Sequence, residues 1–479
     1  MTSGLGLGPA AEPRRVRAVR LGWITIPAGV VAAFVIAIPV VVVGLLVLVA
    51  IDSWTPATTL VAPTPAAVSV LWDRHAPIAD GAKSHSDVFY GVVCPPGGNC
   101  VAYGNDLATD DAARPLLVTQ HGSTWTPMTL SLPAGAAPWR DSISEVDAVS
   151  CIRKECIALG DYKDAHQVLH VFSNTFAGHP STTELPISAD AEHANELGTG
   201  PDEDALVSLS CWSTTGCLAA ITINFDDGEQ DRFELLRFDG TKWSLLPNPQ
   251  IPLSTEEYGD QVDQVSCTAQ GWCALAGHGT DSMGESLRAW SAVPSGKTWK
   301  ARLDRDLQVY EGLSCTAAGP CRALAFAGST EALVTITKSG ATTTTKLPRK
   351  FDLYGFGCSA QRCAFSGPAD EKEGGYLGTS LGTSTSTTRA QPNNEVLRLG
   401  NPGTVACASS SFCLAVGGYQ IGPFDAPSAP LIEVFSKGSW RATTPSAPGG
   451  LVTGTLNGVA CQSAAHCVAI GQWHGDVSP

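Results

Sequence analysis

The sequence predicts an all-β fold, a single β-propeller, from evenly spaced cysteine pairs and a repeating unit around them. The 479 residues include sixteen cysteines, which form eight pairs with four or five residues between the partners. From one pair to the next the step is 43 to 60 residues. Each step holds several short apolar runs separated by turns, and four-stranded units with a period of about 40–50 residues indicate propeller blades. Eight pairs predict eight four-stranded blades, with seven as the alternative.

The residues around each pair repeat as well. In most units an apolar residue and then a small one precede the first cysteine, as in Leu209 and Ser210, and x-Ala-x-Gly or a variant follows the second, as at 101–104 and 468–471. The glycine is missing after Cys217 and Cys321. Such alternation is typical of buried strands, and small residues suit a crowded centre. Each pair is therefore expected at the two ends of a tight strand–turn–strand, where opposite Cβ atoms lie close enough for a disulfide.

An even number of cysteines in an exported chain indicates disulfides, whereas zinc or iron–sulfur ligation would favour clustered pairs. The expected disulfides are Cys94–Cys100, Cys151–Cys156, Cys211–Cys217, Cys267–Cys273, Cys315–Cys321, Cys358–Cys363, Cys407–Cys413 and Cys461–Cys467. After Cys467 only residues 468–479 remain, so the last blade must take its outer strands from the N-terminal side, at 67–72 and its neighbours. Pairing the two chain ends removes exposed edges from the ring.

The N-terminal segment predicts a membrane anchor. Between Arg20 and Asp52 lie 31 residues without a charge, and about 20 apolar residues span a bilayer as a helix. We expect a transmembrane helix at 21–51, with the arginine-rich residues 1–20 in the cytoplasm. Residues 52–66, rich in Pro, Thr and Ala, are predicted to form a stalk. Residues 67–479 are predicted to form an extracytoplasmic propeller. A cleaved signal peptide is the alternative, but no suitable cleavage site follows the apolar run.

The net charge of the chain narrows the classes of binding partner that we expect. From residue 52 onward the chain has 44 acidic and 26 basic residues, a net charge of −18. No basic patch remains, so nucleic acid is not an expected partner. The weak calcium candidate is the carboxylate run Asp226, Asp227, Glu229 and Asp231, which lacks the spacing of a calcium-loop motif. A solvated acidic loop is the alternative, and we expect no bound metal and no cofactor.

The cysteine hairpin followed by Ala-x-Gly resembles bacterial exported β-propeller repeats of the WD40/YVTN/BNR-like type. The turns at 121–125 and 295–299 also look like the end of the Asp-box of sialidase-like propellers, although its aspartate is absent. The resemblance implies the architecture and leaves the activity open, because propellers host many unrelated functions.

No catalytic residue can be assigned, since the sequence has no nucleophile elbow, P-loop or HExxH motif. His166 and His170 lie four residues apart, but on a strand they would sit well apart, so zinc is not expected. A four-stranded meander puts the cysteine hairpins and the glycine–tryptophan turns on one face. The opposite face, which we call the long-loop face, carries long connections such as 186–205 and 417–430, where binding tends to reside. The sequence thus predicts a single-pass, non-catalytic envelope module that binds a protein or a glycan there; a sialidase-like glycan hydrolase is the alternative.

Overall fold

The computed structural model describes residues 67–72, 86–109, 112–128, 130–136, 144–166, 168–176, 181–187, 206–223, 232–252, 257–281, 287–304, 306–316, 319–328, 330–347, 353–367, 376–381, 384–390, 398–420, 428–443, 445 and 454–473. They belong to one compact unit, Thr64–Pro479. The expected cytoplasmic tail, transmembrane helix and stalk at 1–66 lie outside them. Among the described residues, no helix is long and apolar enough to cross a membrane.

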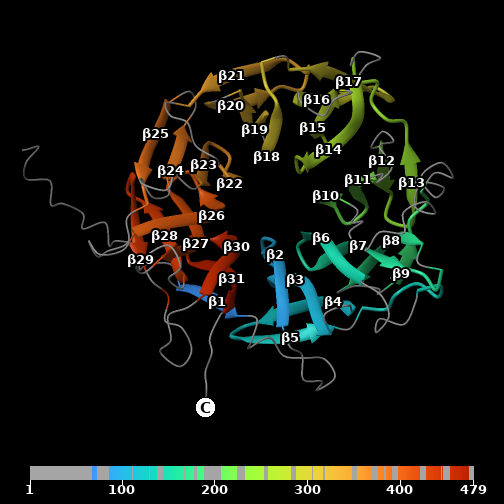
Figure 1. Cartoon of the computed structure of the whole chain (residues 1–479), viewed down its shortest axis with the longest axis horizontal. Helices are drawn as coiled ribbons and strands as arrows, with labels where there is room; N and C mark the ends of the chain where they lie inside the picture. The colour runs from blue at the N-terminus through green and yellow to red at the C-terminus, as the bar shows by residue number, and fades with distance from the viewer. Residues whose placement is uncertain are drawn as a thin grey trace, which may run out of the picture. The chain divides into compact units, whose positions relative to one another are not determined.

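The named elements of the described chain are strands, and their sheets stand around a common centre as propeller blades (Figure 1). Blades 1 to 4 comprise β2 (Ser86–Val93), β3 (Val101–Thr109), β4 (Ala112–His121), β5 (Thr124–Met128); β6 (Ser144–Ile152), β7 (Glu155–Lys163), β8 (Leu169–Phe176), β9 (Ser181–Glu184); β10 (Leu206–Ser213), β11 (Gly216–Ile223), β12 (Arg232–Phe238), β13 (Trp243–Leu246); and β14 (Glu257–Cys267), β15 (Cys273–Asp281), β16 (Leu287–Ser295), β17 (Thr298–Leu303).

Blades 5 to 8 comprise β18 (Val309–Cys315), β19 (Cys321–Ala327), β20 (Thr330–Ile336), β21 (Thr342–Lys346); β22 (Gly355–Cys358), β23 (Arg362–Gly367), β24 (Tyr376–Leu381), β25 (Ser384–Arg389); β26 (Arg398–Ser409), β27 (Phe412–Gln420), β28 (Ser428–Ser436), β29 (Ser439–Thr443); and β30 (Gly454–Ser463), β31 (His466–Trp473), β1 (Ala67–Trp72). Within each of blades 1 to 7, four antiparallel strands follow one another in sequence order, with the first innermost. The predicted all-β propeller is confirmed, with eight blades.

Blade 8 closes the ring with three described strands, in the order β1-β31-β30. Residues 67–72 supply the outer strand, as the sequence indicates, but β1 runs parallel to β31, with Ala67 opposite His466 and Trp72 opposite Gly471. The chain explains this direction. β2 starts from the long-loop face and β31 runs toward that face, so β1, parallel to β31, ends on the face where β2 begins.

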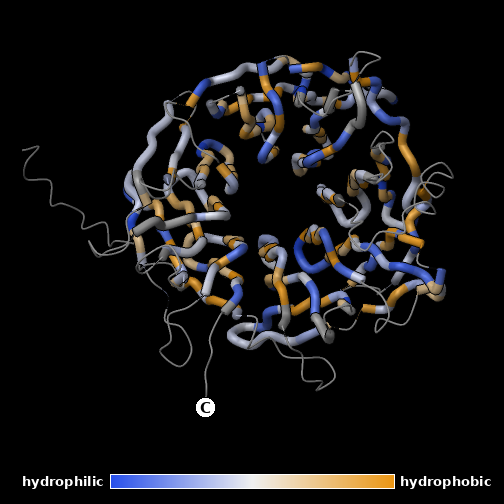
Figure 2. The backbone as a smooth tube through the Cα atoms, in the orientation of Figure 1, coloured by the Kyte–Doolittle hydropathy of each residue, from blue (hydrophilic) through white to orange (hydrophobic). Residues whose placement is uncertain are grey.

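The core lies between neighbouring blades. One cluster joins Leu218 and Leu235 of blade 3 to Leu275 and Trp290 of blade 4, and equivalent clusters recur around the ring. Alanines on the second strand of most blades, such as Ala158, are fully buried, because the blades converge toward the centre and leave little room there. Figure 2 shows hydrophobic residues along the strands of every blade, interleaved with hydrophilic ones.

The structure holds eight disulfides, each within one expected pair, and no free cysteine among its described residues. They join the end of the first strand to the start of the second, as where Cys151 lies opposite Cys156. The predicted disulfide hairpin in the blades is therefore confirmed.

The small residue before the first cysteine also has a role that its size does not suggest. In three blades it is a serine whose Oγ accepts a hydrogen bond from the backbone N–H of the next blade's first cysteine. The pairs are Ser150 with Cys211 (3.1 Å), Ser210 with Cys267 (3.0 Å) and Ser266 with Cys315 (2.9 Å). These bonds satisfy donors on the inner edge of an innermost strand, which no further strand covers.

Candidate binding site on the innermost strands

A β-bulge recurs on the innermost strands. In six blades the register with the second strand shifts by one residue, and the extra residue always lies four positions before the first cysteine. These extra residues are Tyr90, Asp147, Asp263, Glu311, Gly403 and Asn457. A bulge bends its strand and redirects a side chain, and bulges are enriched beside functional sites. The repeat thus places one additional residue on the innermost strand of each of these six blades.

The glycine of x-Ala-x-Gly explains where the bulge forms. A Cβ atom on Gly160 would lie 1.9 Å from the carbonyl oxygen of Glu145, and one on Gly277 would lie 2.1 Å from that of Gln261. In both blades this carbonyl belongs to the residue two positions before the extra one. The bulged backbone therefore occupies the space that a side chain would need.

The two blades without this glycine test the explanation. Blade 3 has Ile221 at the equivalent position, and Val207 pairs with it in regular register. Blade 5 has the small Ala325 there and keeps its bulge, at Glu311. In these two blades a large side chain coincides with a regular strand and a small one with a bulge, whereas blade 6 has Gly367 at this position and no register shift in its described pairs.

We call the eight residues four positions before the first cysteines the inner ring. To the six bulge residues it adds Val207 and Tyr354, which directly precedes β22. Tyr90 and Tyr354 are 46% and 62% exposed, and they are two of the four large hydrophobic residues that are exposed among the described residues. Glu311 and Asn457 are exposed, and Asp147 and Asp263 are half-buried. The inner ring therefore presents two tyrosines and three carboxylates, and no lysine or arginine.

Blades 1 and 2 hold their ring residues in a polar network. The hydroxyl of Tyr90 donates to Oε2 of Glu145 (3.1 Å), and Nδ2 of Asn105 donates to the Tyr90 hydroxyl (2.8 Å) and to the same carboxylate. These bonds leave the Tyr90 ring exposed while they fix its hydroxyl.

Glu145 also belongs to a carboxylate cluster at this junction. Together with Asp147 and Asp161 it offers oxygen atoms that all lie within 4.8 Å of one another. Carboxylate oxygens are the ligands that calcium and magnesium prefer, so among the described residues this cluster has the chemistry to hold such an ion.

In blade 4 the ring residue is paired with a histidine. Nδ1 of His278 lies 2.8 and 3.1 Å from the two carboxylate oxygens of Asp263. Burial raises the pKa of Asp263, and the hydrogen bond and charge of His278 oppose that rise. Asp263 thus joins a half-buried pair, whereas Glu311 of the next blade is exposed.

Three tyrosines that are buried or half-buried next to carboxylates predict a loss of stability in alkali. Burial, and then the charge of Asp147, raises the pKa of Tyr103 to about 12. Burial, and then the charge of Glu184, raises the pKa of Tyr162. Burial, and then the charge of Asp304, raises the pKa of Tyr310. Since these groups keep their protons in the folded chain after the unfolded chain has lost them, the free energy of unfolding should fall as the pH rises above about 10. The expected slope is about 1.4 kcal/mol per pH unit for each tyrosine.

Urea unfolding of the wild type between pH 8 and pH 11 measures this slope, and Tyr103→Phe should make it shallower. Tyr354→Phe, at an exposed position, is the control and should keep the wild-type slope. Equal unfolding free energies at both ends of the range would contradict the prediction.

His166 and His170, which lie four residues apart in the sequence, make different contacts. His170 contacts Oε1 of Glu184 (3.0 Å) and stacks on Tyr162, and its Nε2 lies 3.5 Å from Asp164. His166 is exposed and reaches Asp164 through its backbone N–H. The two side chains thus do not share a ligand set.

The calcium candidates Asp226, Asp227, Glu229 and Asp231 lie outside the described residues, as do most of the long connections. Sequence reasoning missed the inner ring, although two signals mark it. One is the position four residues before each first cysteine, and the other is the glycine four residues after the second cysteine in six of the eight pairs.

Fold and site together define an eight-bladed β-propeller with disulfide-closed inner hairpins and a polar inner ring. No protein-family model matches the sequence, and no curated protein is similar to it.

Solved structures with a similar fold include a streptogramin B lyase (TM-score 0.37, 8% identity, covering 68% of this chain and 89% of that one). They also include YCF48 bound to D1 peptide (0.40, 12%, 78% and 99%) and a GH74 xyloglucanase from Xanthomonas campestris (0.44, 12%, 78% and 58%). At these identities the likeness concerns the fold alone.

Proposed function

We propose that this protein is a membrane-anchored, extracytoplasmic, non-catalytic binding module that holds a basic segment of an envelope protein at its inner ring. The observation that carries the proposal is that two exposed tyrosines and three carboxylates stand at equivalent positions of the innermost strands. The anchor is the apolar segment 21–51, and the disulfides agree with an oxidising compartment.

The chemistry of the inner ring favours a cationic ligand. Carboxylates form charge-assisted hydrogen bonds with lysine and arginine, and the face of a tyrosine ring attracts the same cations. Tyrosine is also enriched where binding energy concentrates in protein interfaces. The net charge of −18 from residue 52 onward would draw a basic partner toward this surface.

Fluorescence anisotropy with labelled oligolysine, and with labelled oligoglutamate for comparison, tests the proposal on the full-length protein in detergent micelles. We expect salt-dependent binding of oligolysine only. Tyr354→Ala and Glu311→Gln should each weaken it about fivefold or more, the loss typical of an important interface residue.

Glu155→Gln is the matched control, because Glu155 is an exposed acid beside the disulfide of blade 2. This variant should bind oligolysine as the wild type does. If oligolysine were only attracted to the acidic surface in general, Glu155→Gln would weaken binding as much as Glu311→Gln. Binding that is unchanged in both ring variants, or an equal affinity for oligoglutamate, would overturn the proposal.

A sialidase-like glycan hydrolase has one observation in its favour. The cluster of Glu145, Asp147 and Asp161 brings carboxylates to within about 5 Å, near the separation found in retaining glycosidases. Against this, Asp161 is only 2% and Glu145 only 8% exposed. Cleavage of fluorogenic glycosides that is lost in Glu145→Gln would favour the hydrolase over the binding module.

A further inference from the structure

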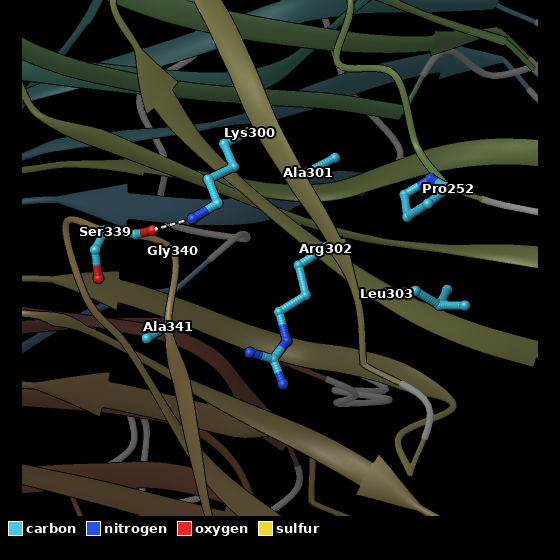
Figure 3. Close-up of a pocket in the computed structure, with 8 residues that line it drawn as sticks. All are labelled: Pro252, Lys300, Ala301, Arg302, Leu303, Ser339, Gly340 and Ala341. Carbon is cyan, nitrogen blue, oxygen red and sulfur yellow. Dashed lines mark hydrogen bonds between the residues drawn. The ribbon is translucent and has the colours of Figure 1, made fainter.

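A depression lies at the rim of the propeller, on the outer strand of blade 4 and the β20–β21 turn of blade 5 (Figure 3). Its volume is about 500 Å³. The lining residues are Pro252, Lys300, Ala301, Arg302, Leu303, Ser339, Gly340 and Ala341. Two of them are cations and none is an acid, although the chain as a whole is strongly acidic.

The two cations share one side of β17. Lys300 and Arg302 alternate along the strand, so both side chains leave it on the same face. Figure 3 shows both extending to the side of the strand where Ser339 and Gly340 lie. Both are exposed, so a ligand in the depression could reach the two charges together.

Neighbouring groups hold both cations in place. Nζ of Lys300 donates to the carbonyl oxygen of Ser339 (2.9 Å), and Nε of Arg302 lies 3.3 Å from Oδ1 of Asp304. Asp304 is 7% exposed, and among the described residues it is the acid that pairs with Arg302. A buried carboxylate that engages Nε orients the guanidinium, whose planar fork can bind an anion through two parallel hydrogen bonds.

Asp304 is itself fixed by three hydroxyl groups. Ser291 and Tyr310 donate to its Oδ2 (2.9 and 2.7 Å), and Thr342 of blade 5 donates to its Oδ1 (3.0 Å). The arrangement from Tyr310 through Asp304 to Arg302 resembles the supporting shells of binding sites, which lock the geometry of the residue that meets the ligand.

The fold does not require this pair of cations. In four blades the outer strand contains a tryptophan, and the residues one and three positions after it occupy the places of Lys300 and Arg302. They are Thr126 and Met128 in blade 1, Ser244 and Leu246 in blade 3, Lys300 and Arg302 in blade 4, and Arg441 and Thr443 in blade 7. Two cations therefore occur at one of four equivalent places.

We propose that this depression is a second binding site, for a saccharide unit that carries a carboxylate or sulfate group. Lys300 and Arg302 pair with the anionic group, and the small and apolar residues around them pack against the C–H face of the sugar ring. The site is opposite in charge to the inner ring and lies on an outer strand, so it stands independently of the function proposed above.

Isothermal titration of the full-length protein in detergent micelles, with trigalacturonate as the probe, tests this site. Its neutral methyl ester keeps the sugar and removes the charge, and inorganic phosphate at equal ionic strength supplies charge without a sugar. We expect trigalacturonate to bind at least about tenfold more tightly than either, since hydrogen bonds to charged groups contribute about that factor. Lys300→Gln and Arg302→Gln should each weaken binding by a similar factor.

Arg441→Gln is the matched control, because it removes a cation from the same strand position in blade 7, and it should leave the affinity unchanged. Lys300→Gln keeps the test valid if Arg302→Gln destabilises the fold by uncovering Asp304. Four results would each overturn the proposal: no binding of trigalacturonate at millimolar concentration, equal binding of its methyl ester, equal binding of phosphate, or wild-type affinity in both blade 4 variants.

Discussion

Complete reduction of the eight disulfides is expected to unfold the propeller at room temperature. Each disulfide spans a sequence separation of only 5 or 6, for which the chain-entropy model gives about 2 kcal/mol. One such contribution is modest, but the same contribution recurs in every blade. Their sum matches or exceeds the free energy of unfolding of a typical protein, which is roughly 5–15 kcal/mol.

Tryptophan fluorescence and circular dichroism with and without a phosphine reductant measure this effect. The double variant Cys151→Ser/Cys156→Ser isolates one blade and should lose about 2 kcal/mol of unfolding free energy in urea while remaining folded. An oxidised and a fully reduced protein with the same urea midpoint would show that packing alone maintains the ring.

Replacing Trp72 should open the ring at its closure. Trp72 on β1 is 4% exposed and packs with Phe412, Leu414 and Leu456 of blades 7 and 8. Trp72→Ala should cost about 3–5 kcal/mol, the usual loss for a buried aromatic residue. Because β1 covers β31, the amides of β31 should exchange with deuterium faster, while those of β11, in blade 3, should keep their protection.

Trp440→Ala provides the comparison, since Trp440 lies on the outer strand of blade 7 and packs on Phe435 without closing the ring. It should lower the stability without selectively exposing β31. If both variants speed exchange in β31 to the same extent, closure by β1 is not what protects the last blade.

The propeller could be predicted because its evidence is local and repeated. Alternation of apolar residues, the spacing of Cys151 and Cys156, and the shortage of residues after Cys467 all follow from positions along the chain. The direction of β1 could not be read in the same way. It depends on the face from which β2 starts, and that is a property of the closed ring.

The inner ring could not be predicted because its members share a position and no residue type. Tyr90, Asp147 and Asn457 have little in common until the bulges align them. A bulge is a feature of strand pairing, and the sequence shows only its counterpart, the glycine, which we interpreted as a consequence of close packing. The long connections, where we expected binding, lie mostly outside the described residues.

Net charge misled the search for basic surfaces. The prediction that no basic patch remains rests on a sum over the chain, and such a sum conceals two neighbouring cations on one strand. Lys300 and Arg302 acquire meaning only through Ser339 and Asp304, which hold them in place.

The parallel pairing of β1 with β31 also sets an order of events during synthesis. The first strand of the propeller to leave the ribosome finds its partner only when almost the last residues, beginning at His466, have followed it. Until then β1 carries Leu71 and Trp72 with nothing to cover them, and such a segment invites pairing with the wrong chain. A long wait between the first and the final contact slows folding, so completion of the ring should be the slow step, and a chaperone that shields an apolar strand should speed it.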